Sequence, residues 1–394
     1  MTSSFIKYYT SLGISPVSQN INNIYLQFLG REHLYLSCGI WPESLEGKNI
    51  IEFGPGGGFN SIYTASLNPK RYTLVEGNPV AQNQIRGFIE NKLLPTTIDL
   101  RAKLFEDVTP TATFDLVIAE GCIPHQSNPR AVLQHISKFV KPGGLFLTTA
   151  ISATSYLSEI FRRLVPNLLG INHRDSEVVL SKLHDFYAIQ LNALPHHTRS
   201  VNDWILDNIV QDLENRALFS MAEIVSELEE EFTVVGSSPS LAFYKNWYKS
   251  YSDPQCFQTR AVEARMAISA AEAALLDLRC MNFQLRPGLS AELSVLSEES
   301  WIQMKEIQKD NAEPEKFSKS LGKLIKLTEN VSPETATSLK SFESFLYTKD
   351  LTSLLNPGSL VDWWGRGQQY VTLRRNPPWY TKLKMGQISQ VLEE

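Results

Sequence analysis

The chain has 394 residues, of which 43% are hydrophobic, and a formal net charge of −5 at pH 7. It can bury a large core in more than one domain, and its acidic balance argues against a nucleic-acid partner. The four cysteines form no Cys-x-x-Cys pair, which argues against a zinc site and fits the cytoplasm, and no apolar run is long enough for a membrane span or a signal peptide.

Residues 1–48 are predicted to form a helical lead-in to the fold. Within residues 22–36, apolar side chains recur at roughly helical spacing, at Ile24, Phe28 and Tyr35. We therefore expect an amphipathic helix before the first strand.

The stretch from residue 49 to residue 79 reads NIIEFGPGGGFNSIYTASLNPKRYTLVEGNP. A short apolar strand ends in Glu52 and Phe53, a glycine turn and a helical pattern follow, and a second strand ends at Glu76. This order predicts the opening unit of a doubly wound α/β sheet. Glycines lack a Cβ atom and so let a ligand approach the main chain. Glu76 stands where such folds place an acid that accepts ribose hydroxyls.

Two classes of nucleotide use such a layout. In the dinucleotide pattern Gly-x-Gly-x-x-Gly, Gly54 and Gly56 fit, but the third glycine position falls on Phe59. The sequence Glu-Phe-Gly-Pro-Gly-Gly-Gly instead resembles the first motif of class I S-adenosylmethionine (SAM) methyltransferases. In that family, the acid before the glycines orders the methionine end of the cofactor, which carries an amine. A pyrophosphate would be repelled by Glu52. A tight turn without a ligand stays open as the plain alternative.

The resemblance continues along the chain. A third strand is expected near residues 98–104 and a fourth in FDLVIAEG at residues 114–121, followed by the phrase FVKPGGLFLTT. The last phrase resembles the helix–turn–strand junction of the same family, with residues 141–144 as the turn and 145–151 as the fifth strand. The match covers about residues 48–151. It implies an α/β fold, with a Rossmann-like class I methyltransferase sheet, helices on both faces and large, mainly helical insertions.

The resemblance also implies the cofactor, S-adenosyl-L-methionine, and its product, S-adenosyl-L-homocysteine (SAH). Asp107, or alternatively Glu106, is expected to accept from the adenine amino group, although a solvated acidic turn would look the same. Asn78 also suits the cap of a following helix, with Pro79 at its first position. The predicted cofactor-binding residues are Glu52, Gly54, Pro55, Gly56, Gly58, Asn60, Glu76, Gly77, Asn78, Glu106, Asp107, Glu120 and Gly121.

His125 is the predicted catalytic residue. It follows the fourth strand, which in this family ends beside the reactive methyl group. An ordinary histidine pKa near 6.5 suits it to take a proton from a hydroxyl or amine. A structural role for His125 remains open. Cys122 is read as a small core residue, because methyl transfer from SAM needs no covalent intermediate.

The later part of the chain is expected to carry the insertions. The expected segments are a lead-in at 1–48, a SAM-binding core at 49–151, a helical substrate cap at 152–219, a helix and sixth strand at 220–239, a second helical insertion at 240–360, and a last strand and tail at 361–394. Ser220 and Glu223 form a capping box. The first insertion holds four of the seven histidines, but their spacing matches no ligand motif, so no metal is predicted.

We therefore predict a SAM-dependent methyltransferase that acts on an oxygen, or a nitrogen, of a small molecule of natural-product type by direct in-line displacement. Three alternatives stay open. They are a protein or peptide methyltransferase, a non-catalytic subunit with the same fold, and an NAD-dependent oxidoreductase. A homodimer formed through the helical insertions is a further expectation.

Overall fold

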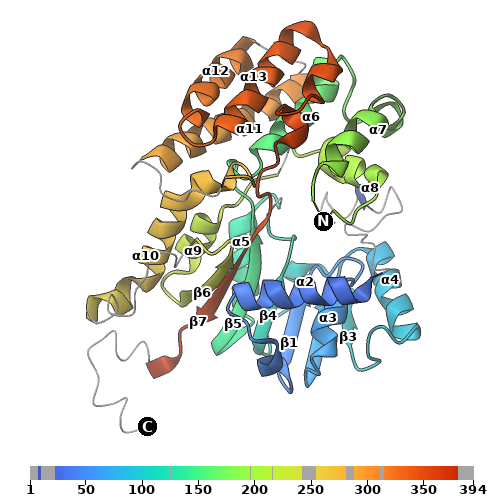
Figure 1. Cartoon of the computed structure of the whole chain (residues 1–394). Coiled ribbons are helices and arrows are strands. Elements are labelled where there is room, and N and C mark those ends of the chain that lie inside the picture. Colours follow the sequence, from blue (N-terminus) through green and yellow to red (C-terminus); the bar gives the residue numbers. More distant parts are fainter. Residues whose placement is uncertain are drawn as a thin grey trace. The chain divides into compact units, whose positions relative to one another are not determined.

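The computed structural model describes residues 8–9, 23–124, 126–195, 197–214, 216–241, 254–280, 288–310 and 315–379 (Figure 1). The chain divides into two compact units. The first comprises Met1–Ala150, Phe219–Ile268 and Gln369–Glu394, and the second comprises Ile151–Leu218 and Ser269–Gln368. Within the described ranges, no helix has both the length and the apolar character needed to cross a bilayer.

The first unit is built on one seven-stranded sheet with the order β3-β2-β1-β4-β5-β7-β6. The strands β1 to β5 are parallel, and β7 runs antiparallel to both of its neighbours. The bounds are β1 Asn49–Phe53, β2 Arg71–Val75, β3 Asp99–Arg101, β4 Phe114–Ala119, β5 Val140–Ala150, β6 Phe232–Ser238 and β7 Gln369–Arg375. This is the expected Rossmann-like sheet of the class I methyltransferases, and the prediction of the fold is confirmed.

The central strands are buried because helices cover the sheet. Ile50, Ile51 and Phe53 of β1 are fully buried, as the apolar run in the sequence predicts for a parallel strand covered on both faces. The helical elements of this unit are α2 Ile24–Ser37, η1 Pro42–Leu45, α3 Ser61–Ser66, α4 Pro79–Glu90, η2 Phe105–Asp107, α5 Pro129–Ser137, α9 Met221–Leu228 and α10 Pro254–Ala271. Asn78 caps α4 through its side chain, and Ser220 with Glu223 forms the predicted capping box of α9.

Two strand predictions were wrong in extent. Residues 141–144 do not interrupt the chain between helix and strand, because β5 runs without a break from Val140. The extra residues form a bulge, since Phe114 pairs with Val140 while Leu116 pairs with Leu145. Gly143 has a φ of +77°, which glycine allows at such a bulge. The third strand is confined to Asp99–Arg101.

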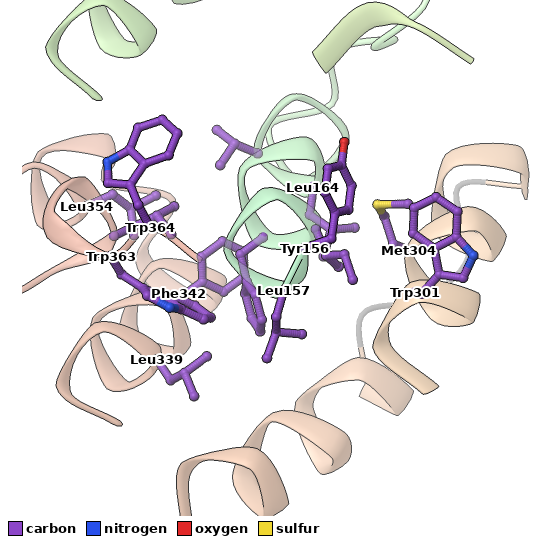
Figure 2. Close-up of a cluster of buried hydrophobic side chains, with 14 of the residues drawn as sticks. Tyr156, Leu157, Leu164, Trp301, Met304, Leu339, Phe342, Leu354, Trp363 and Trp364 are labelled. Atoms are coloured by element: carbon purple, nitrogen blue, oxygen red, sulfur yellow. The ribbon is translucent and has the colours of Figure 1, made fainter. Parts of the chain in front are cut away.

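The second unit is helical. Its elements are α6 Leu157–Leu168, α7 Ser176–Asn192, α8 Val201–Ile205, the π-helical turn η3 Leu206–Val210, η5 Glu272–Leu275, α11 Leu289–Asp310, α12 Glu315–Thr328, α13 Pro333–Thr348, η6 Leu351–Leu354 and η7 Leu360–Asp362. Its two chain segments share one apolar core, shown in Figure 2. There Phe161 of α6 contacts Phe342 of α13 with ring centroids 4.8 Å apart, and Trp363 is fully buried beside them.

Candidate cofactor site

The glycine turn follows β1 at the carboxyl end of the sheet. Gly54, Gly56 and Gly58 have φ values of +68°, +56° and +82°, in the left-handed region that side chains disfavour. A Cβ atom on Gly54 would stand 2.8 Å from the Cβ atom of Cys122. The Gly58 N–H donates to the Pro55 carbonyl at 3.0 Å and closes the turn. The main chain is therefore bare where a ligand of an open α/β sheet binds.

Glu76 reaches this turn from the end of β2. Its Oε2 accepts from the Gly56 N–H at 3.0 Å, and its Oε1 accepts from the Asn78 N–H at 2.7 Å. Burial raises the pKa of Glu76 to about 7. The structure thus brings the predicted ribose acceptor and the predicted glycine turn together. Asn78 adds a buried Nδ2 donor that has no partner among the described residues.

Glu52 is held inside the sheet layer. It is buried, and its Oε2 accepts from the Ser61 hydroxyl at 2.8 Å and from the Tyr72 hydroxyl. Burial raises the pKa of Glu52 as well. A negatively charged or hydrogen-bonding carboxyl group is therefore fixed next to the glycine turn, where the sequence predicts the partner of the cofactor amine.

The two acids that are expected to bind the adenine end of the cofactor lie at the same edge of the sheet, but not at the glycine turn. Glu106 and Asp107 belong to η2, which follows β3, and both are exposed. The ring of Phe105 in the same turn packs edge-on against Phe53, with centroids 5.7 Å apart. Gly77 lies between Glu76 and the cap of α4. Asp107 and Glu106 thus stay predictions for a ligand contact.

Glu120, the first residue after β4, is the centre of a half-buried polar cluster. Its Oε1 accepts from Arg31 Nη1 at 2.9 Å, from Asn60 Nδ2 at 2.9 Å and from the Tyr370 hydroxyl at 2.7 Å. The Gly121 N–H next to it donates to Thr149 Oγ1 at 2.8 Å. Glu120, Gly121 and Asn60 were predicted site residues, whereas Arg31 and Tyr370 were not.

Helix α2 contacts the residues that follow the glycine turn through a row of polar side chains on one of its faces, here called the polar stripe. Gln27 Nε2 donates to the Phe59 carbonyl at 2.7 Å, and the hydroxyls of Tyr35 and Thr64 share a hydrogen bond of 2.6 Å. Burial is the largest single influence and lowers the pKa of Arg31, but Glu120, Tyr35 and Tyr370 together outweigh it and hold that pKa well above its ordinary value. The four-residue spacing of Gln27, Arg31 and Tyr35 marks this stripe in the sequence.

The predicted catalytic residue, His125, lies outside the described residues. Cys122 is buried, and its Sγ–H donates to the Phe53 carbonyl at 3.3 Å. Burial raises the pKa of the Cys122 thiol far above neutrality, so the group stays protonated.

Comparison with known proteins shows what part of this chain is similar to. Residues 25–204 match the family described as Methyltransferase domain. Over these residues the chain is similar to a methyltransferase domain. A stretch of 163 residues is 29% identical to the mitochondrial ubiquinone biosynthesis O-methyltransferase of Dictyostelium discoideum, covering 36% of this chain and 49% of that protein. A stretch of 114 residues is 30% identical to the ubiquinone biosynthesis O-methyltransferase of Methylobacterium sp. (strain 4-46), covering 29% and 45%.

The chain spans about half the length of these curated relatives. Among solved structures, the N-methyltransferase NodS from Bradyrhizobium japonicum WM9 in complex with SAH is 17% identical, covers 38% of this chain and 75% of that chain, and has a TM-score of 0.31.

The residues of this site fit SAM, the predicted cofactor. The glycine turn leaves the main chain bare, and the carboxyl group of Glu76, the predicted acceptor for the ribose hydroxyls, lies beside it. The free Nδ2 donor of Asn78 lies next to that carboxylate in sequence and remains for a ligand acceptor. Glu52, the predicted partner of the cofactor amine, lies buried before the turn. These four features are those that an adenosyl amino acid requires.

Proposed function

We propose that the enzyme transfers the methyl group of SAM to a hydroxyl oxygen of a small organic molecule by direct in-line displacement. The observation that carries the proposal is the contact between Glu76 and the Gly56 amide, which makes one compact acceptor–donor site at the end of β1 and β2. The choice of a small-molecule oxygen is supported by relatives named as O-methyltransferases of ubiquinone biosynthesis.

The protein contributes orientation more than chemistry. Bound SAM supplies a sulfonium methyl group that a nucleophile can displace without a covalent enzyme intermediate. The residues of this chain hold the ligand at the sheet edge, so that the acceptor meets the methyl group in line. A hydroxyl acceptor also needs a group that takes its proton, and His125 stays the predicted base.

Calorimetric titration with SAH, with NAD and NADP in parallel, tests the cofactor site. We expect micromolar binding of SAH and none of the nicotinamide nucleotides. Gly56→Val should abolish SAH binding. A branched side chain at a φ of +56° strains the turn and occupies space that the ligand needs. Gly47→Val is the matched control, since Gly47 has a φ of +69° and lies before β1, outside the turn. Equal SAH affinity in the wild type and Gly56→Val would refute the site.

Incubation with SAM carrying a labelled methyl group tests the acceptor. The proposal expects label in a small phenol or alcohol and none in a peptide mixture, measured by mass spectrometry of the products. Label in peptides alone would replace the small-molecule proposal by a protein methyltransferase. Label in amines alone would replace oxygen by nitrogen as the acceptor atom.

A further inference from the structure

A cavity lies within the second unit, where the carboxyl-terminal ends of α6, α11 and α13 and the loop after α6 line it. Its volume is about 610 Å³, within the range of about 300–1,000 Å³ that is typical of pockets for small organic molecules. Two groups of side chains in its lining suggest a ligand. They are an apolar wall, formed by Leu168, Ile171 and Ile307, and three cations, Arg174, Lys309 and Lys349.

The lining of this cavity is positively charged. None of the described residues that line it is acidic. Two carboxylates outside the lining do pair with two of the cations. Glu214 lies 3.3 Å from Lys309 and 3.4 Å from Arg174, and Asp212 lies 3.1 Å from Arg174. These four side chains are all exposed, and exposed ion pairs are weak, so both cations remain able to bind an anion.

Lys349 is the cation that lacks a counter-charge among the described residues. Burial is the only influence on its pKa, which it lowers, and no carboxylate acts on it. The neighbouring Asp350 is engaged elsewhere, since it accepts from the main chain and the hydroxyl of Thr352. Lys349 ends α13 with a φ of +56°, where glycine or asparagine is the usual residue. The chain thus places an ammonium group at the cavity although the backbone there disfavours lysine.

Neutralisation of helix ends explains only part of this arrangement. Lys309 lies in the last turn of α11 and Lys349 caps α13, so both also offset the negative ends of their helices. Arg174 has the opposite setting, because it directly precedes Asp175, the N-cap of α7, and cations are disfavoured at a helix N-terminus. Helix ends also give no reason for an apolar wall beside the charges. A ligand with both a charged and an apolar part accounts for all of these features.

We propose that this cavity binds a small organic anion, a carboxylate or a phosphate carried on a short apolar body. The charged group meets the three cations, and the apolar body packs against the apolar wall. All the lining residues belong to the second unit, whereas the residues of the candidate cofactor site belong to the first. The inference therefore adds a second ligand site and does not depend on the proposed methyl transfer.

Calorimetric titration of the full chain with phenyl phosphate, benzoate and benzamide tests the proposal, with and without saturating SAH. The probes share an aromatic ring, and only benzamide is uncharged. We expect phenyl phosphate to bind if the site recognises phosphate, benzoate to bind if it recognises carboxylate, and benzamide not to bind. An increase of NaCl from about 50 to about 500 mM should weaken binding of the anion about 3-fold or more, because salt screens exposed charges.

Lys349→Asn tests whether the probe binds in this cavity. Asparagine tolerates a left-handed backbone, so the variant should fold while it loses the charge. It should weaken the anion about 10-fold or more, whereas Lys349→Arg, which keeps the charge, should stay within about 3-fold of the wild type. Lys326→Gln is the matched control. Lys326 is an exposed lysine in the last turn of α12 and does not line this cavity, so the control should bind as the wild type does.

Each possible result decides for or against the site. The inference is overturned if neither anion binds, if benzamide binds as tightly as the anions, or if Lys349→Asn keeps the affinity of the wild type. Competition between SAH and the anion would place the probe in the cofactor site and would overturn it too. The affinity for SAH itself is measured separately, so a failure of this inference leaves the proposed function standing, and a failure to bind SAH leaves this inference standing.

Discussion

The carboxyl group of Glu76 should make the enzyme less stable as the pH rises. Burial raises the pKa of Glu76 from 4.5 to about 7 in the folded protein. Between these values, the folded state keeps a proton that the unfolded state has lost. The free energy of unfolding therefore falls as pH rises from about 4.5 to about 7, and this contribution is constant below and above that window.

The size of the effect follows from the shift. A shift from 4.5 to about 7 corresponds to about 3 kcal/mol, at about 1.4 kcal/mol for each pH unit. Glu76→Gln removes the titration. The variant should match the wild type within about 1 kcal/mol at pH 4.5 and should be about 2–3 kcal/mol more stable at pH 8. It should also bind SAH about 10-fold or more weakly, because the ribose hydroxyls lose a charged acceptor.

Urea denaturation of both proteins at half-unit steps from pH 4.5 to 8 measures the difference. Glu52 titrates in the same direction, since its pKa is also raised, so only the difference between variant and wild type isolates Glu76. Glu46→Gln is the exposed control and should follow the wild type at every pH. A Glu76→Gln curve parallel to that of the wild type would show that Glu76 does not keep its proton in the folded state.

Two more substitutions test the packing and the ion pair of the site. Gly54→Ala should lower the free energy of unfolding by about 3 kcal/mol, because its backbone is strained and its Cβ atom would stand 2.8 Å from Cys122. Gly47→Ala is the control, since Gly47 has a φ of +69° and no atom within 4 Å of an added Cβ atom. It should lose only the stability that backbone strain costs. Equal losses in urea titration would contradict the close contact. Arg31→Met should cost about 3–5 kcal/mol by leaving the largely buried carboxylate of Glu120 without its cationic partner, and Arg31→Met/Glu120→Met should recover most of that loss. A coupling energy below about 0.5 kcal/mol in this double-mutant cycle would mean that the pair is not coupled.

The fold was predictable because its signals are local. Three signals each predict a local structure from only a few residues. They are the apolar run before Gly54, the glycines of the turn and the capping box at Ser220. The bulge at residues 141–144 was missed, because Lys-Pro-Gly-Gly reads as a turn in isolation. The pairing of Val140 with Phe114 decides otherwise, and that pairing is tertiary.

The sequence predicts the site residues only where they belong to one sequence motif. Gly56 and Glu76 are 20 positions apart in the sequence and meet through two adjacent strands. Tyr370 meets Glu120 from 250 positions away, and no local pattern announces such a partner. Arg31 carried a weak sign, a charged residue at helical spacing between Gln27 and Tyr35, but its partner had to come from the structure.

The place of β7 in the sheet has a consequence for how the protein is made. This strand lies between β5 and β6, yet it begins at Gln369, roughly 200 residues after β5 ends at Ala150. At about 5–20 residues per second, a ribosome needs roughly 10–40 s to synthesise the intervening chain. During that time β5 exposes an unpaired edge, and β6 does so as well once residues 232–238 have been made; such an edge is a template for aggregation. Nascent chains of this enzyme should therefore depend on chaperones until the last strand emerges.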